Sequence, residues 1–218
     1  MKKLLLSAFV ICLAGTSIAQ ESPLWMRHCA LSPDGTTIAF TYKGDIYTVP
    51  STGGRATQIT TNPAFDTEPV WSPDSKQIAF ASDRMGSLDV FVVSSEGGAP
   101  QRLTTHSGSE KPVAYKDNKH ILFTANIAPS AEDAGFPSGQ FQQVYEVAVT
   151  GGRPAMFSSM PMECISINKE GVMLYQDKKG YEDYWRKHQV SPIARDIWTY
   201  TPGKKPVYQK QTTFGGED

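Results

Sequence analysis

The chain has 218 residues, of which 39% are hydrophobic and 20% are charged, and its formal net charge at pH 7 is -1. This composition is that of a globular protein and excludes an intrinsically disordered chain. The near-neutral charge gives no electrostatic reason to expect nucleic acid or an anionic membrane as a partner.

The N-terminal segment has the pattern of a signal peptide. The basic pair Lys2 and Lys3 is followed by an apolar run to Ala14, and small residues occupy the two positions that a signal peptidase reads before the bond after Ala19. The alternatives are a buried N-terminal strand or a membrane anchor, and the run is short for a membrane span. We therefore expect residues 1–19 to be cleaved and the protein to be exported, with a bacterial periplasm as its destination.

A nine-residue stretch occurs twice. Residues 32–40 read SPDGTTIAF, and residues 72–80 read SPDSKQIAF. Pro and Asp at the central positions of Ser-Pro-Asp-Gly favour a type I turn. The apolar triplet after the turn recurs in diverged form, which makes four copies, at 38–40, 78–80, 121–123 and 173–175.

Each triplet begins a regular succession of strands and turns. Further strands are expected at 45–47, 89–91, 143–145 and 196–198. Glycine-containing turns follow at 53–54, 97–98, 151–152 and 202–203, and each unit closes on a short run at 59–61, 103–105, 157–159 or 211–213. Four antiparallel strands in a repeat of this length are typical of a β-propeller blade. The sequence therefore predicts an all-β propeller with four four-stranded blades, at about 24–61, 67–105, 111–159 and 163–213; a β-sandwich or β-solenoid is the alternative.

Two cysteines remain after signal cleavage. Cys29 and Cys164 fall at nearly equivalent places in the first strands of blades one and four. These blades are not neighbours in a closed ring, so we expect buried free thiols rather than a disulfide.

Two insertions lengthen the same loop of adjacent blades. Residues 126–140 in blade three and 178–194 in blade four both separate the second strand from the third, so both project from one face. Insertions gathered on one face of a repeat array mark a binding face. The second insertion supplies aromatic and basic candidates for binding a substrate or partner, since such residues often anchor interfaces; they are Tyr184, Trp185, Arg186, Lys187 and His188. The alternative is a solvated loop whose aromatic side chains fold back onto the blade.

No catalytic or cofactor motif is present. The chain has no G-x-S-x-G, H-E-x-x-H or G-x-x-x-x-G-K pattern. Its histidines are isolated, and no spacing suggests a zinc site. We predict no catalytic residue, metal or cofactor in this chain.

The repeated order SPDG, IAF, D-I-Y, GG and LTT resembles the TolB-type propeller repeat, also called PD40, over residues 23–218. That repeat occurs in TolB, in the propellers of dipeptidyl and prolyl peptidases, and in tricorn-like proteases. The stretch 183–188 leading to 194–198 looks like the fourth blade of the first tricorn propeller, and the insertion at 126 falls where that family has one. The resemblance implies that residues 20–218 are four blades of a six-bladed N-terminal propeller in a secreted bacterial tricorn-like serine protease.

The resemblance also implies a role and a set of partners. The propeller would guide or sieve peptides and brace protease domains that carry the catalytic serine and histidine, in a parent protein that could be a homo-oligomer. Archaeal relatives hold a peptide carboxylate with paired basic residues between blades two and three. The matching stretch here offers His106 and Lys111 with Glu110 beside them, which departs from that pattern; Arg195, in the blade-four match, is a further candidate. The alternatives are a TolB-like periplasmic interaction propeller and the propeller of a dipeptidyl-peptidase-like enzyme.

Overall fold

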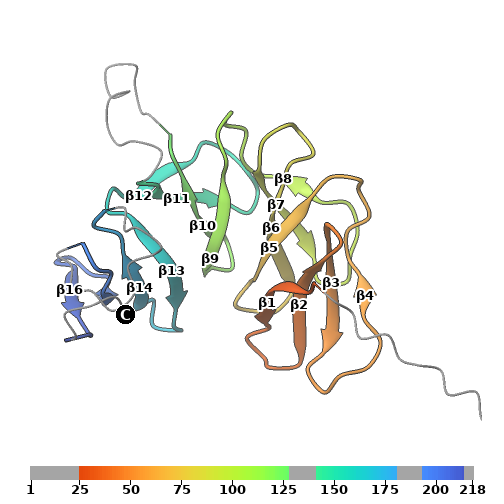
Figure 1. Cartoon of the computed structure of the whole chain (residues 1–218), viewed down its shortest axis with the longest axis horizontal. Coiled ribbons are helices and arrows are strands. Elements are labelled where there is room, and N and C mark those ends of the chain that lie inside the picture. The colour runs from red at the N-terminus through yellow and green to blue at the C-terminus, as the bar shows by residue number, and fades with distance from the viewer. Residues whose placement is uncertain (1–24, 128–140, 181–192, 214–218) are drawn as a thin grey trace, which may run out of the picture.

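The computed structural model describes residues 25–127, 141–180 and 193–213. Within these ranges the chain forms sixteen strands in four antiparallel four-stranded sheets, and no helix (Figure 1). The predicted all-β propeller architecture with four four-stranded blades is therefore confirmed. No helical segment of the described chain has the length and apolar character needed to cross a membrane.

Each sheet is one blade, and its strands lie side by side in chain order. Blade one comprises β1 (Arg27–Leu31), β2 (Thr37–Tyr42), β3 (Asp45–Pro50) and β4 (Thr57–Gln58). Blade two comprises β5 (Asp66–Trp71), β6 (Gln77–Ser82), β7 (Asp89–Ser94) and β8 (Gln101–Arg102). Blade three comprises β9 (Lys111–Asp117), β10 (His120–Ala125), β11 (Gln143–Ala148) and β12 (Ala155–Ser158). Blade four comprises β13 (Met162–Ile167), β14 (Met173–Asp177), β15 (Ile197–Thr201) and β16 (Val207–Lys210).

The repeated Ser-Pro-Asp stretch forms the tight turn that its residues predict. The Gly35 amide donates to the Ser32 carbonyl at 2.8 Å, and the Ser32 hydroxyl donates to the Asp34 carboxylate at 2.6 Å. In the second copy the Ser75 amide donates to the Ser72 carbonyl at 2.9 Å. The turn thus satisfies its own polar groups, which explains why both copies keep the same residues.

The second repeated motif joins the third strand of a blade to the end of its fourth strand. In blade one the Ile46 amide donates to the Thr60 hydroxyl at 3.0 Å, and that hydroxyl donates to Asp45 at 3.4 Å. The equivalent backbone bond occurs in two other blades, from Val90 to Thr104 at 2.9 Å and from Ile197 to Thr212 at 3.2 Å. The recurrent aspartate and threonine therefore close the outer edge of a blade.

The hydrophobic core lies between blades rather than within them. Stacked aromatic pairs lie on the face of a blade that meets the preceding blade, such as Phe80 and Phe91, whose ring centroids are 5.9 Å apart. This pair packs on smaller side chains of blade one, including Ala39 and Ile46. Burial of apolar surface at such junctions stabilises neighbouring blades together, because no blade covers both its faces alone.

The four blades form an arc. Contacts between blades run from β1 to β5, β9 and β13, and among the described residues no comparable contact joins β13 back to β1. The first strand of each blade lies on the concave side of this arc (Figure 1). This arrangement is that of part of a propeller, with the first strands around its central channel.

The two cysteines are free, as expected, but the prediction that they are buried is wrong. Both Cys29 and Cys164 are exposed. The strand register shifts between Arg27 and Ala30 in blade one, and Cys164 has a positive φ of 52° within a similar shift in blade four. A bulge breaks the alternation of inward and outward side chains, so the burial of these cysteines could not be predicted from their positions in the strands.

Candidate functional site

A cavity of about 650 Å³ lies where the first strands of all four blades meet. Apolar side chains, which we call the channel wall, line it near the carboxyl ends of these strands: Ala30, Leu31, Val70, Val113, Ile165 and Ile167. Lys116, Asp117 and Lys169 also line the cavity. Because every blade contributes to it, the cavity depends on the arc as a whole. Its size is that of a small-ligand or peptide site, and its wall suits apolar side chains.

The opposite ends of the first strands carry charged residues that pair between strands. Lys111 Nζ lies 2.7 Å from Glu68 Oε1, so this ion pair links blade three to blade two. Both side chains are partly exposed, which keeps the energetic value of the pair modest. The predicted binding residue Lys111 would have to release Glu68 before it could hold a peptide carboxylate alone.

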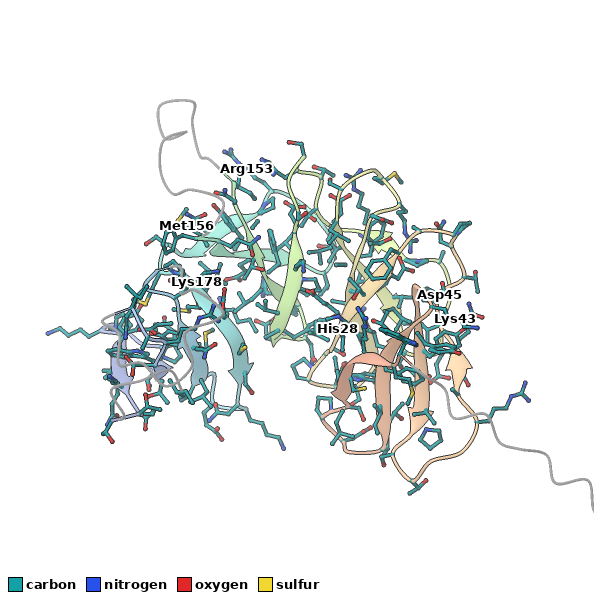
Figure 2. All side chains as sticks on the ribbon, in the orientation of Figure 1. His28, Lys43, Asp45, Arg153, Met156 and Lys178 are labelled. Carbon is teal, nitrogen blue, oxygen red and sulfur yellow. The ribbon has the colours of Figure 1, made fainter. Side chains whose placement is uncertain are left out.

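A second charged cluster joins the blade-four insertion to the channel. Glu163 on β13 accepts from Lys178 Nζ at 2.8 Å and from Arg195 Nη1 at 2.7 Å. Lys178, labelled in Figure 2, and Arg195 stand at the two ends of the predicted insertion. The structure therefore places Arg195 beside a first strand and brings both ends of the insertion to the charged ends of the first strands, which we call the channel mouth.

A buried aspartate reinforces these insertion ends. Asp196 pairs with Lys179 and with Lys210, whose Nζ lies 2.7 Å from its carboxylate. The hydrogen bonds from Lys179 and Lys210 lower the pKa of Asp196 to about 2. Burial opposes the charged form of Lys179, but its bond to Asp196 and the nearby Asp177 raise its pKa overall. Both partners therefore stay charged at neutral pH and hold the insertion ends in place.

The structure adds little about the other predicted binding residues. His106 lies between blades two and three, where its Nδ1 accepts from the Gly108 amide at 3.0 Å. The remaining candidates lie outside the described residues: Tyr184, Trp185, Arg186, Lys187 and His188. In the part of the chain that the structure describes, no three His, Cys, Asp or Glu residues are grouped to hold a metal ion.

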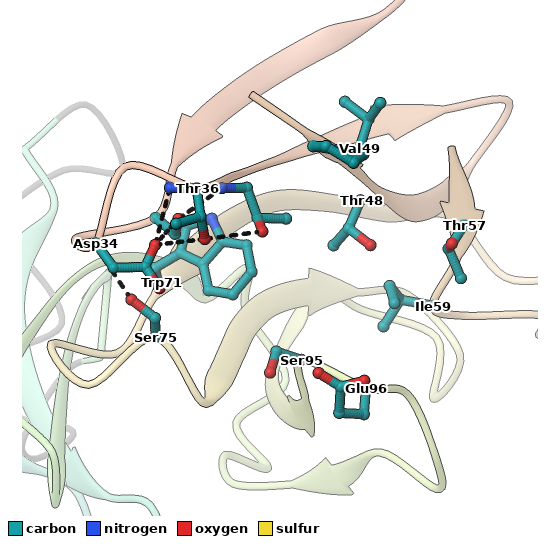
Figure 3. A pocket seen from close by; sticks show the side chains of 13 residues that line it. Asp34, Thr36, Thr48, Val49, Thr57, Ile59, Trp71, Ser75, Ser95 and Glu96 are labelled. Carbon is teal, nitrogen blue, oxygen red and sulfur yellow. Dashed lines mark hydrogen bonds between the residues drawn. The ribbon is translucent and has the colours of Figure 1, made fainter. Parts of the chain in front are cut away.

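A hydroxyl-rich hollow of about 350 Å³ lies between blades one and two, on the face opposite the insertions (Figure 3). Threonine and serine side chains line it together with Asp34, Glu96 and the Trp71 ring. The Trp71 Nε1 donates to the Ala30 carbonyl at 3.0 Å, so its polar group is already satisfied. None of the described residues that line this hollow is basic, which makes it unsuited to a peptide carboxylate.

Sequence reasoning missed the acidic partners in these clusters. Glu68 and Glu163 lie within first strands, where they were not distinguished from ordinary surface charges. The available signal was their place within the first strand, which faces the channel in a propeller. The clusters were invisible in the sequence because Glu68 and Lys111 are 43 residues apart.

Four-stranded blades with their first strands around a shared cavity define the chain as a β-propeller. Residues 23–217 match the tricorn protease N-terminal beta propeller domain family. The chain therefore belongs to the tricorn N-terminal propeller family, as its repeats suggested.

Individual relatives agree with this assignment. Tricorn protease homolog 1 of Streptomyces coelicolor is 39% identical over 77 residues, which are 35% of this chain and 7% of that protein. The crystal structure of the tricorn protease has a TM-score of 0.67 at 16% identity, over 90% of this chain and 19% of that one. TolB from Acinetobacter baumannii has a TM-score of 0.60 at 18% identity, over 88% and 45%. The two structures show the shared fold, and the chain spans only a small part of the tricorn relatives.

Proposed function

We propose that the chain is a non-catalytic segment of a tricorn-like serine peptidase, in which it guides or sieves peptides and braces the protease domains. Membership of the tricorn propeller family and the short span of the relatives that it matches support this role. Catalysis would belong to other domains of the parent protein, which could act as a homo-oligomer. In this proposal the four blades belong to a ring of six, and peptides are the ligands.

The observation that carries the proposal is the cavity shared by four blades. Its channel wall is apolar, and the other ends of the same strands carry the pairs of Lys111 with Glu68 and of Arg195 with Glu163. An extended peptide presents apolar side chains and charged ends, so these two zones would guide it along the axis.

A matched pair of arginine substitutions in the intact protein tests this role. Leu31 on the channel wall is 58% exposed, and Met85 on a loop is 60% exposed, so neither change disturbs a core. We expect Leu31→Arg to lower kcat/KM for long apolar peptides much more than for a short chromogenic substrate. Met85→Arg should leave both unchanged. Equal effects of the two variants, or none from Leu31→Arg, would exclude passage of substrate along this wall.

The proposed location is the periplasm, after cleavage behind Ala19. An immunoblot of the periplasmic fraction with an antibody against the 181–192 peptide tests both location and parentage. A band several-fold larger than 23.9 kDa supports a protease parent. A single band slightly below that mass would instead favour the second candidate, a TolB-like module that binds periplasmic proteins, which the likeness to the TolB fold supports.

The dipeptidyl-peptidase-like parent is the third candidate. It predicts a G-x-S-x-G nucleophile elbow in the domain joined to this propeller, whereas a tricorn-like parent predicts a PDZ-like domain and a different serine protease domain. Peptide mapping of the larger band by mass spectrometry would separate these two parents.

A further inference from the structure

Blade two shows how this fold accommodates an acid at the start of a first strand. Asp66 is fully buried, and Arg84 Nη2 lies 3.0 Å from each of its carboxylate oxygens. The Arg84 guanidinium also lies 4.5 Å from the centroid of the Phe91 ring and donates to Ser82 at 2.8 Å. The acid is thus paired with a guanidinium that packs on an aromatic ring, a favourable combination.

Blade three keeps the acid and the ring but lacks the arginine. Glu110 is equivalent to Asp66, because each amide donates at 2.7 Å to the residue that precedes the third strand of the preceding blade. Tyr145 takes the place of Phe91 in the stacked pair. Four residues beyond the stacked phenylalanine of the second strand, where blade two has Arg84, blade three has Ile127.

The result is a pocket of about 480 Å³ at the position of the missing guanidinium. Glu110, Ile127 and Tyr145 line it, together with Met156 and Arg153, which Figure 2 shows on the outer side of blade three. Glu110 is fully buried, with Thr104, His106 and Asp89 near its carboxyl group, but among the described residues no cation forms an ion pair with it. A buried carboxylate is costly to charge without a cation beside it, so the pocket lacks the counter-charge that Arg84 supplies in blade two.

We propose that this pocket binds a guanidinium group supplied by a ligand, placed against Glu110 and the Tyr145 ring as Arg84 is placed in blade two. The pocket is large enough for an arginine side chain. That the carrier is an arginine of a peptide rests on the proposed function; the guanidinium site itself does not.

The chain's nearby segments do not supply the group. Residues 126–140, the insertion that follows β10, contain no lysine or arginine. Arg102 lies near but is already engaged, with Nη2 2.8 Å from Asp89. Arg153 belongs to the exposed outer edge, where water screens its repulsion of a second cation. A ligand is therefore the source that completes the pocket.

Calorimetric titration of the intact protein with agmatine at about pH 8 tests the site directly. Agmatine carries a guanidinium on a flexible chain, and butylamine is a matched probe without the planar fork. We expect saturable agmatine binding that is about tenfold or more weaker in Glu110→Gln, which keeps the shape of the side chain. Ile127→Arg should restore the blade-two arrangement and abolish agmatine binding, whereas Ile127→Met should retain it.

Two results would overturn the assignment. One is the absence of saturable agmatine binding to the wild-type protein. The other is equal binding to the wild type, Glu110→Gln and Ile127→Arg, which would locate the probe elsewhere. Loss of peptide guidance by the Leu31→Arg variant would not change agmatine binding, so failure of the proposed function and failure of this site give different results.

Discussion

The stability of this propeller should depend on pH through one buried carboxyl group, that of Glu110. Burial raises its pKa from the ordinary 4.5 to about 7. The Thr104 hydroxyl and the His106 amide oppose this increase, and the nearby Asp89 adds to it. Replacement by glutamine removes the ionisation while it preserves the volume, so Glu110→Gln isolates the cost of charging this site.

The sign and the size of the effect follow from proton linkage. Between about pH 4.5 and pH 7 the folded state keeps the Glu110 proton that the unfolded state has lost, so stability falls as pH rises. Each unit of pKa difference is worth about 1.4 kcal/mol, so the loss amounts to about 3 kcal/mol and is complete above about pH 7. The glutamine variant does not ionise and escapes this loss.

Urea unfolding of both proteins at about pH 4.5 and about pH 8 measures the effect, and other titrating groups cancel in the comparison. The free energy of unfolding of Glu110→Gln, relative to wild type, should rise by about 3 kcal/mol between the two pH values. Glu146→Gln is the matched control, because Glu146 is partly exposed and pairs with Lys116 at 2.7 Å. A wild-type-to-variant difference that is the same at both pH values would refute the reasoning.

Three further experiments test other parts of the fold. Arg84→Met should lower the free energy of unfolding by about 3–5 kcal/mol, because it leaves buried Asp66 without its counter-charge. Adding Asp66→Asn should recover most of this loss in a double-mutant cycle. Ser75→Gly should raise stability in urea by up to about 1 kcal/mol, because Ser75 has a φ of 59°. Residues 20–218 made alone should self-associate in sedimentation, since the arc leaves two blade faces open; a sharp monomer with a cooperative melt would contradict this.

The blade architecture could be predicted because its determinants are local. The turn that begins at Ser32 closes within four residues, and its hydrogen bonds are made by the residues that the repeat retains. The stacked rings of Phe80 and Phe91 are 11 residues apart and directly opposite in the register of β6 and β7. Short-range patterns of this kind survive in the sequence, and four copies make them easy to recognise.

The channel mouth could not be predicted in the same way, because its contacts cross between blades or between the ends of an insertion. Glu163 and Arg195 are 32 residues apart, and neither belongs to a repeated motif. Bulges add a second difficulty. His28, Glu68 and Cys164 have positive φ values of 51°, 55° and 52° in the first strands of three blades, which disrupts the alternation that strand patterns assume.

Blade three departs from the other three blades at this position, and the reason explains the charged pair that it places at the channel. Pro112 occupies the equivalent place in blade three, and its ring prevents a positive φ. The strand instead bulges at Val113, which leaves Lys111 directed at Glu68 of the preceding blade. Repeated blades therefore serve as references for one another: what they share maintains the fold, and the positions where one blade differs are where a ligand or a neighbouring domain has the strongest physical reason to bind.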